Sequence, residues 1–400
     1  MDREKPFGKA NRLLRMTHLL TRIRPARVPF THRQNRITLY EDGSRFFPSL
    51  YEAVRKAERF ILAEYYLVRN DRTGTALASE LTEAVRRGVR VLLIYDYIGS
   101  IDTPAGFFRD LSATGIEVVP FNVPSFHRGI HWFDRRDHRK MAVIDGSLAF
   151  VGGFNIGDEY SDLAENPQRF YDLGFSIQGS AVQELVQIFT ETWFLERGTL
   201  PFLPLGVDRD RSRIEPQEGG DVIIVSGGPG QRRSRIRNTF LVNIAAASEE
   251  ILIITPYFIP GPRVIRALLR AARRGVRVRL LLPARCDVPL IRFLARAYYG
   301  ILLKEGIGIR EMEEEILHAK VMLIDGKQAV IGSANFDQRS FHRNYEINFM
   351  ISDNDLSGRI RAIHQKDFIK SRPIVLAEHE RRGLIVRVLE KIIGLFSWFL

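Results

Sequence analysis

Two copies of one short motif carry the side chains best suited to chemistry. Residues 138–145 and 318–325 both read HxKxxxxD, and the second copy follows the first by 180 residues. Two imidazoles with two ammonium groups beside them suit a phosphodiester. One imidazole can attack phosphorus, the other can protonate the leaving oxygen, and the lysines neutralise the non-bridging oxygens. The candidate catalytic residues are His138, Lys140, Asp145, His318, Lys320 and Asp325.

The spacing within each motif indicates an extended strand. Side chains alternate along a strand, so His138 and Lys140 share one face, as do His318 and Lys320, while the residue between them faces away. A pseudo-twofold axis between the copies would bring the four side chains into one cluster. A divalent metal is the main alternative, but lysine is a poor ligand and two lysines would repel the cation. The pattern therefore predicts a phosphodiester site with neither metal nor cofactor.

A longer repeat surrounds the motifs and predicts the elements that position them. Residues 84–93 match residues 271–280, and each stretch leads from a helical pattern through a glycine into an apolar run. Another apolar run precedes each helix, at residues 60–62 and 251–254. This order predicts βαβ units. The expected fold class is α/β, with two repeats related by a pseudo-twofold axis, each a mixed, mostly parallel sheet flanked by helices.

The repeat also sets the expected domain boundaries. Residues 196–220 combine prolines, clustered Asp and Arg and a glycine pair, which is typical of a linker. The first repeat carries an aromatic-rich insertion at residues 121–135, whose place beside the motif favours a lid or a substrate wall. The predicted parts are a basic amphipathic N-terminal segment (1–34), a first repeat (35–200), a linker (201–220), a second repeat (221–376) and a C-terminal helix (377–400).

Length and composition limit the class of protein. The 400 residues exceed one small domain, and 45% hydrophobic residues can form a sizeable core. The single cysteine, Cys286, excludes an intramolecular disulfide. A formal net charge of +12 indicates a polyanionic partner, either nucleic acid or an anionic membrane surface.

The two ends of the chain suggest how it meets its substrate. Residues 384–400 place Arg387, Glu390 and Lys391 on a narrow helical stripe and leave a broad apolar face, which is typical of an interfacial helix. A helix docked on the protein's own core is the alternative. Residues 11–24 mix leucines and arginines, and there the two interpretations are balanced. No stretch is long and apolar enough for a spanning helix or a signal-peptide core.

Further residues after each motif strengthen the pattern. Residues 152–155 and 332–335 each combine a pair of small residues with an asparagine. Together with the doubled motif, this pattern resembles the phospholipase D superfamily over residues 39–368. Residues 138–160 and 317–337 look like the bacterial cardiolipin synthase branch in particular.

The resemblance implies a two-step, metal-free mechanism. His138 would form a phosphohistidine, and His318 would act as general acid and then as general base. Asp145 and Asp325 belong to the family's motif, although they look more structural than chemical. The two repeats differ at Gly153, because the corresponding residue of the second repeat is Ser333. The other implied roles are phosphate binding by Lys140, Lys320, Asn155 and Asn335 with help from Ser333, and imidazole orientation by Asp172 and Glu346.

The resemblance also implies a cardiolipin synthase-like phosphatidyltransferase, which joins two phosphatidylglycerols into cardiolipin and glycerol. A hydrolytic phospholipase D, or a transferase that uses another donor such as phosphatidylethanolamine, would employ the same residues. A nucleic-acid phosphodiesterase of the superfamily is a further alternative, but the apolar pattern of residues 384–400 argues against a nucleic-acid partner. The expected partners are an anionic phospholipid and a membrane surface. The expected location is peripheral, on the cytoplasmic face of the inner membrane.

Overall fold

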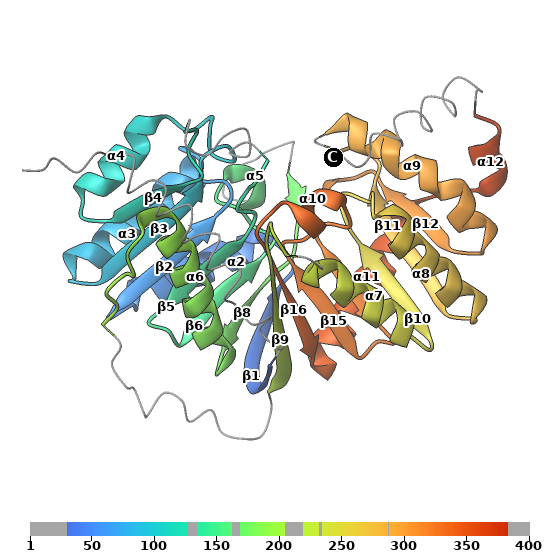
Figure 1. The fold of residues 1–400 in the computed structure, drawn as a ribbon, viewed down its shortest axis with the longest axis horizontal. Coiled ribbons are helices and arrows are strands. Elements are labelled where there is room, and N and C mark those ends of the chain that lie inside the picture. The colour runs from blue at the N-terminus through green and yellow to red at the C-terminus, as the bar shows by residue number, and fades with distance from the viewer. Residues whose placement is uncertain are drawn as a thin grey trace, which may run out of the picture.

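Two α/β repeats lie side by side and share one continuous sheet, which confirms the expected fold class (Figure 1). The structure is a computed structural model. It describes residues 30–125, 134–161, 169–204, 219–231, 234–286 and 288–382.

The first repeat follows the βαβ order that the sequence predicts. Asp42 and Asp71 begin two of its helices by accepting a hydrogen bond from a backbone N–H of the first turn. The helix at residues 72–86 ends before Gly88, whose φ of +89° provides the expected glycine cap. The elements are β1 (Thr31–Tyr40), α2 (Gly43–Arg55), β2 (Phe60–Tyr65), α3 (Arg72–Arg86), β3 (Arg90–Asp96), α4 (Ala105–Ala113), β4 (Glu117–Phe121), β5 (Lys140–Ile144), β6 (Leu148–Gly152), α5 (Asp158–Ser161), β7 (Phe170–Tyr171), β8 (Gly174–Gln178) and α6 (Ala181–Arg197).

The second repeat reproduces this order. Gly275, with φ of +89°, ends the helix at residues 261–273 as Gly88 does in the first repeat. The elements are β9 (Gly220–Gly227), α7 (Arg235–Ala246), β10 (Glu250–Ile254), α8 (Gly261–Arg273), β11 (Arg277–Pro283), α9 (Pro289–Lys304), β12 (Gly308–Met312), β13 (Ile316–Leu317), β14 (Val321–Ile324), β15 (Gln328–Gly332), α10 (Gln338–His342), β16 (Glu346–Ser352), α11 (Asn354–Lys370), β17 (Arg372–Pro373) and α12 (Leu376–Glu380).

The large sheet has the strand order β17-β12-β11-β10-β14-β15-β16-β9-β1-β8-β6-β5-β2-β3-β4. The repeats meet where β1 pairs antiparallel with β9, with a register irregularity between His32 and Asn35. The strands β2–β3–β4 and β10–β11–β12 pair in parallel, and the other pairs of this sheet are antiparallel. The parallel share is smaller than expected, because tight turns join β5 to β6 and β14 to β15 and such turns require antiparallel neighbours.

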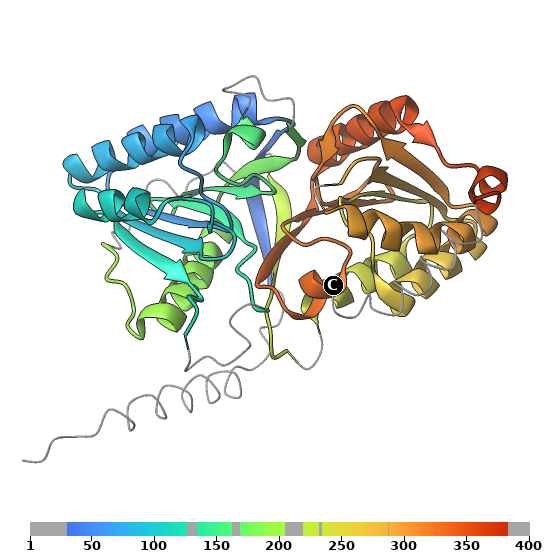
Figure 2. The same cartoon turned by 90° about the horizontal axis from the view of Figure 1, so that it is seen from above.

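Helices cover both faces of the sheet in each repeat. Figure 2 shows α2 and α3 on one side of the first half and α7 to α9 on the opposite side of the second half, as a twofold rotation would place them. The remaining faces are covered by α6 and α11, whose apolar residues belong to one core cluster that continues across both repeats. The junction between the repeats is therefore part of the hydrophobic core.

Several predicted features lie outside the described residues. They are most of the N-terminal segment, residues 126–133 of the insertion, residues 205–218 of the linker and the C-terminal helix from residue 383 on, so the domain boundaries stay predictions. The last described helix, α12, packs on α9, where His379 stacks on Tyr299. Within the described ranges, no helix combines the length and the apolar composition needed to cross a membrane.

Candidate active site

The two motifs lie where the repeats meet, each histidine just before a central strand, β5 or β14. The backbone N–H of His138 donates to the carbonyl of Tyr345 at 2.9 Å, and that of His318 donates to the carbonyl of Tyr171 at 2.8 Å. Around these contacts β13 pairs in parallel with β7, and Asp137 forms a parallel bridge with Tyr345. Backbone hydrogen bonds between the repeats therefore place both motifs.

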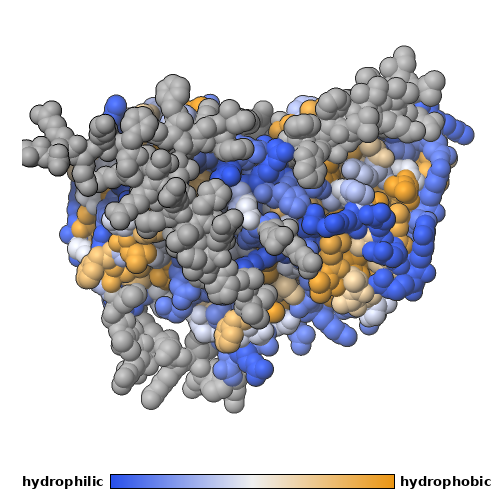
Figure 3. Space-filling model, viewed as in Figure 1, coloured by the Kyte–Doolittle hydropathy of each residue, from blue (hydrophilic) through white to orange (hydrophobic). Residues whose placement is uncertain are grey.

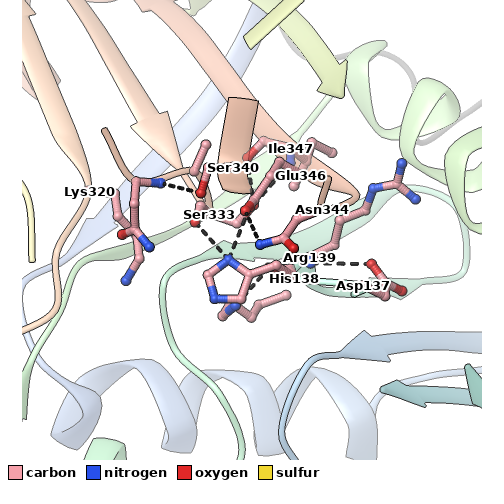
Figure 4. Close-up of polar contacts among 12 residues, drawn as sticks. Asp137, His138, Arg139, Lys320, Ser333, Ser340, Asn344, Glu346 and Ile347 are labelled. Atoms are coloured by element: carbon pink, nitrogen blue, oxygen red, sulfur yellow. Dashed lines mark hydrogen bonds and ion pairs between the residues drawn. The ribbon is translucent and has the colours of Figure 1, made fainter. Parts of the chain in front are cut away.

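His138 is oriented by a carboxylate of the second repeat (Figure 4). Its Nδ1 lies 3.1 Å from Oε2 of Glu346 and 3.1 Å from the backbone carbonyl oxygen of Ser333. Both partners accept hydrogen bonds, so we assign the proton to Nδ1, which leaves the lone pair on Nε2. Asn344 donates to the other carboxylate oxygen of Glu346 at 3.3 Å. This arrangement prepares Nε2 of His138 as a nucleophile.

His318 is oriented in the same way by a carboxylate of the first repeat. Its Nδ1 contacts Oδ2 of Asp172, and Nζ of Lys320 lies 2.8 Å from the same nitrogen. The rings of Phe170 and Tyr160 pack against the imidazole, with centroids 5.3 and 5.4 Å away. The aromatic rings and the carboxylate together fix the plane of this imidazole.

The orienting acids are thus exchanged between the repeats. The sequence places one acid after each motif, and the structure brings Asp172 to His318 and Glu346 to His138. The two carboxylates are fully buried, whereas the side chains of His138 and His318 keep 12% and 11% of their surface exposed. Both imidazoles therefore keep surface that a substrate can reach, and this accessible surface is the opening of the site.

Burial and repulsion between cations set the charges of the site. Burial lowers the pKa of His138 to about 4, against an opposing effect of Glu346. Burial, and next the charge of Lys320, lowers the pKa of Lys140 to about 7. His138 is therefore neutral at pH 7. Lys140 is only partly charged at this pH, and an anion bound beside it would raise its pKa.

Both orienting carboxylates stay ionised. Burial raises the pKa of Glu346, but the contact with His138, the charge of Lys140 and the hydrogen bond from Ser333 bring it below its ordinary value. Burial also raises the pKa of Asp172, and the charge of Lys320 together with the contact to His318 lowers it overall. Each histidine thus faces a fixed negative charge.

Both lysines lie beside their own histidines. Nζ of Lys140 donates to the backbone carbonyl of His138 at 2.7 Å and lies 5.2 Å from the centroid of the Tyr66 ring. Nζ of Lys320 donates to the backbone carbonyl of His318 and lies 3.6 Å from the orienting carboxylate. Each ammonium group is therefore held beside the histidine of its own motif.

The smaller residues expected to bind phosphate have different surroundings. Asn155 donates to the hydroxyl of Tyr160 and accepts from a backbone N–H after β2, so its amide is engaged within the first repeat. Ser333 is fully buried and its hydroxyl donates to Glu346, so it supports the orienting acid, and its contact with phosphate stays a prediction. Oδ1 of Asn335 is buried and has no hydrogen-bond partner among the described residues. Asn335 therefore keeps a hydrogen-bond acceptor that no described residue uses.

The lengths of the two acids explain the difference between Gly153 and Ser333. A Cβ atom at Gly153 would lie 1.9 Å from a carboxylate oxygen of Asp172, so a side chain there would displace the acid. In the second repeat the longer Glu346 reaches past the Ser333 hydroxyl and accepts its hydrogen bond. The half-site of His318, meaning this histidine with its orienting acid, thus combines Asp172 with Gly153. The half-site of His138 combines Glu346 with Ser333.

Asp145 and Asp325 lie at the opposite ends of β5 and β14 from the histidines, which corrects their place among the catalytic candidates. Both have a positive φ, 52° and 51°, and turn their carboxylates onto the backbone N–H groups of residues 58–60 and 248–250. Burial raises the pKa of Asp325, but these hydrogen bonds lower it to about 2. The two aspartates fasten the starts of β2 and β10 and take no part in the site.

A buried polar cluster lies behind His138, and the sequence did not predict it. Arg139 faces away from the site, as predicted, and donates to Glu64 at 3.2 Å and to Thr192 at 2.8 Å. Burial, and next the charge of Glu64, raises the pKa of Asp137 well above its ordinary value. Glu64 and Thr192 lie on other segments than Arg139, so no spacing in the sequence links them to it. The arginine itself, at an inward strand position, was the available signal.

The arrangement can hold a phosphodiester between two imidazoles and two ammonium groups, with one neutral imidazole ready to attack. Within the part of the chain that the structure describes, no three His, Cys, Asp or Glu side chains converge in the manner of metal ligands. The positive charge near the imidazoles comes from Lys140 and Lys320.

Comparisons with known proteins agree with this geometry. The family model described as "Cardiolipin synthase, PLD-like domain" matches residues 50–193 and 240–368, more than half of the chain. The cardiolipin synthase of Geobacillus sp. (strain WCH70) is 34% identical over 398 residues, which cover 98% of this chain and 77% of that protein. Cardiolipin synthase 2 of Bacillus anthracis is 34% identical over 356 residues, which cover 89% of this chain and 69% of that protein.

A solved structure supports the fold. Phosphatidylserine synthase of Haemophilus influenzae Rd KW20 superposes with a TM-score of 0.71 at 14% identity, covering 98% of this chain and 100% of that chain. The match extends over both repeats. The chain therefore belongs to the cardiolipin synthase family of phospholipase D-like proteins.

Proposed function

We propose that this protein is a phosphatidyltransferase that joins two phosphatidylglycerol molecules into cardiolipin and glycerol through a phosphohistidine on His138. The observation that carries the proposal is the exchange of acids between the repeats. It gives two histidines that are oriented alike, one from each repeat, at one opening with two lysines beside them. The identity of the lipid follows from the names of the relatives.

In the first step, Nε2 of His138 attacks the phosphorus of one phosphatidylglycerol. The bond from phosphorus to the headgroup oxygen breaks, His318 gives its proton to that oxygen, and glycerol leaves. The negative charge of Glu346 stabilises the positive charge that develops on the attacking imidazole. Lys140 and Lys320 neutralise the non-bridging oxygens, and an anionic phosphate between them raises the pKa of Lys140 from about 7.

In the second step, a hydroxyl of another phosphatidylglycerol attacks the phosphohistidine. His318, now neutral, takes the proton of that hydroxyl, and the bond between phosphorus and nitrogen returns its electrons to His138. The products are cardiolipin and the starting enzyme. Water would give phosphatidic acid instead, so the site has to favour the lipid alcohol over water.

Two asparagines complete the proposed site. Asn335 binds a non-bridging oxygen through the N–H donors of its side-chain amide, and its unsatisfied Oδ1 can accept a hydrogen bond from a hydroxyl of the substrate. Asn155 acts through Tyr160, whose ring packs on His318. We assign Ser333 to the support of Glu346.

We further propose that the protein works as a peripheral enzyme on the cytoplasmic face of the inner membrane. Its partners there are anionic phospholipid and the bilayer surface, in line with the net charge of +12. The C-terminal helix predicted at residues 384–400 lies outside the described residues, and its interfacial role remains a proposal.

The test is incubation of the full chain with vesicles that contain phosphatidylglycerol as the sole lipid, with mass analysis of the lipids and assay of free glycerol. We expect a four-chain diphosphatidylglycerol and an equal amount of glycerol, both in the presence of EDTA. Phosphatidic acid as the main product, also when phosphatidylethanolamine is added, would assign a hydrolase. Cleavage of single-stranded DNA without consumption of lipid would reject both lipid functions.

A further inference from the structure

Helix α9 carries an exposed apolar face. Leu290, Phe293 and Ile301 are 41%, 48% and 48% exposed, and Val288 just before the helix is 39% exposed. Leu290, Phe293 and Ile301 are spaced by three and eight residues, so they lie along one side of the helix. On the view of Figure 3, hydrophobic residues likewise reach the surface of the second repeat beside hydrophilic ones.

The charges of α9 favour an anionic partner. The helix has the sequence PLIRFLARAYYGILLK, which contains no acidic residue. Arg292 and Arg296 keep 35% and 23% of their side-chain surface exposed and share the buried Glu311 as their ion-pair partner, and Lys304, 61% exposed, pairs with Glu380. Two arginines on one carboxylate leave a net positive charge on the helix. An apolar face with basic flanks is typical of a helix that lies in the headgroup region of a membrane.

The opposite face of α9 is fastened to the active site. Ile291 and Leu294 pack with Ile259 in one small core cluster. The N–H of Ile259 donates to the carbonyl of Phe336 at 2.8 Å, and Phe336 directly follows the proposed phosphate ligand Asn335. The helix begins after β11, at the edge of the sheet where the histidines lie. The apolar face and the phosphate site are therefore held by one packed unit.

The first repeat places an apolar side chain at the matching position. Ile101, in the loop from β3 to α4, is 59% exposed. The neighbouring Ser100 accepts a hydrogen bond from the N–H of Val68, which forms a bridge with Ile156, the residue after Asn155. In Figure 1, α4 and α9 lie on the two sides of α5 and α10, the helices that follow the asparagines. Exposed apolar residues thus lie in corresponding segments of the two repeats, on either side of the helices that follow the asparagines.

We propose that the exposed face of α9, with Ile101 of the first repeat, enters an anionic phospholipid bilayer and sets the histidines at the depth of the lipid phosphates. The proposal rests on the lipid substrate of the proposed function. A phosphodiester in a bilayer lies at the boundary between headgroups and acyl chains, so the site reaches it when the residues beside the opening penetrate slightly deeper. Burial of Leu290 and Phe293 drives this contact, and the basic side chains of α9 orient it.

The test compares the full chain with the double variant Leu290→Glu/Phe293→Glu in flotation assays. The vesicles contain phosphatidylglycerol and phosphatidylcholine, and binding needs no turnover. We expect the lipid concentration at which half of the protein is bound to vesicles to be about tenfold higher, or more, for the variant. We expect KM on vesicles to rise accordingly, and activity on short-chain monomeric phosphatidylglycerol to stay unchanged.

The matched control is Val242→Glu. Val242 is 66% exposed on α7, near the end that leads into residues 248–250, at the sheet edge opposite to the histidines. It should bind vesicles as the unchanged protein does. Equal binding by the Leu290/Phe293 variant would overturn the proposal. A changed oligomeric state of this variant in light scattering would assign the face to a second copy of the chain. A loss of thermal stability would assign it to contacts within the chain. Either result rejects the proposed membrane contact.

A second measurement does not depend on a charged substitution. An environment-sensitive dye is attached at Phe293→Cys in a Cys286→Ser background, with Val242→Cys as the control. On addition of anionic vesicles, we expect the emission at position 293 to shift to the blue and to be quenched by brominated acyl chains, with no change at position 242. An unchanged signal at position 293 rejects the contact. If vesicles bind in this way but no lipid is transferred, the proposed function fails while the membrane contact stands.

Discussion

The two repeats agree in backbone but differ behind their histidines. Behind His138, the buried Arg139 contacts Glu64 and Thr192, and Asp137, an acid with a raised pKa, lies next to it. At the corresponding places of the second repeat lie Ile254, Leu317 and Ala319, which belong to the apolar core. A polar cluster in one repeat thus occupies the space that aliphatic side chains fill in the other.

The contacts of the arginine show what the difference achieves. Its guanidinium also donates to Ser226 at 3.0 Å and lies 5.4 Å from the centroid of the Tyr345 ring, and both partners come from the second repeat. Tyr345 accepts the N–H of His138 and precedes Glu346. Arg139 therefore holds the strand that orients His138. The half-site of His138 thus has a polar support behind its nucleophile, whereas that of His318 has an apolar one.

The sharpest test of this comparison is the exchange of each histidine. Both His138→Ala and His318→Ala should lower turnover of phosphatidylglycerol on the order of 10⁴-fold or more, because attack and proton transfer each need an imidazole. With a phosphodiester whose leaving group is nitrophenol, the His318 variant should still release nitrophenol and retain label on His138, since that leaving group needs no proton. Label found on His318 and never on His138 in the unchanged protein would reverse the two roles.

The orienting acids should come next in effect. Glu346→Gln removes the charge opposite His138 and offers an amide that can donate to Nδ1, which favours the wrong tautomer, so we expect kcat to fall about 10³-fold. Asp172→Asn should do the same for His318. Pre-steady-state kinetics should separate them, with the first variant slow to form the phosphohistidine and the second slow to release the leaving group. Identical defects in both steps would mean that the half-sites are equivalent.

Replacement of Arg139 should mainly cost stability. Arg139→Ala leaves the carboxylate of Glu64 buried without its partner, and we expect the free energy of unfolding to fall by about 3–5 kcal/mol in urea titrations. The triple variant Glu64→Ile/Asp137→Leu/Arg139→Ala copies the apolar pattern of the second repeat and should recover most of this loss. Its kcat should stay reduced, because the contacts to Ser226 and Tyr345 are gone. Full activity of the triple variant would leave the cluster without a role in the reaction.

Gly153 and Ser333 should respond unequally to being exchanged. Gly153→Ser forces a side chain against Asp172, where a Cβ would lie 1.9 Å away, so we expect a loss of about 1–3 kcal/mol and an impaired His318. Ser333→Gly removes one hydrogen bond to the carboxylate of Glu346, for which we expect about 1.5–3 kcal/mol at most and a weaker effect on turnover. Thermal unfolding and kcat of the two variants provide the measurement. A harmless Gly153→Ser would show that Asp172 has room to move.

The pH dependence should reveal the lowered pKa values of the first half-site. His138 must be neutral to attack, and its pKa of about 4 means that kcat/KM should fall only as the pH drops through about 4, well below the ordinary value for histidine. Lys140, with a pKa of about 7, loses its charge above that pH, so kcat/KM should also decline on the alkaline side. Bound phosphate raises this pKa, so kcat should decline at higher pH than kcat/KM. An acid limb near pH 6.5 would contradict the neutral, buried His138.

Much of the fold and of the site could be predicted from the sequence, because both depend on local spacing. Alternation along a strand already aligned His138 with Lys140, and Gly88 with Gly275 marked equivalent helix ends. Which carboxylate faces which histidine carries no local signal, since Asp172 and Glu346 follow their own motifs equally. The hydrogen bonds that Asp145 and Asp325 accept from backbone N–H groups could not be predicted either, because they join segments that are far apart in the sequence.

The exchange of acids has a consequence for the time at which the protein becomes reactive. A ribosome releases the first repeat before the second has been made, and N-terminal domains generally fold first. Until β16 is synthesised and placed, His138 has no Glu346 to set its tautomer and no Tyr345 to hold its backbone. An incomplete chain that contacts lipid therefore carries a His138 that is not yet oriented for attack. The reaction can begin only when the second repeat is complete.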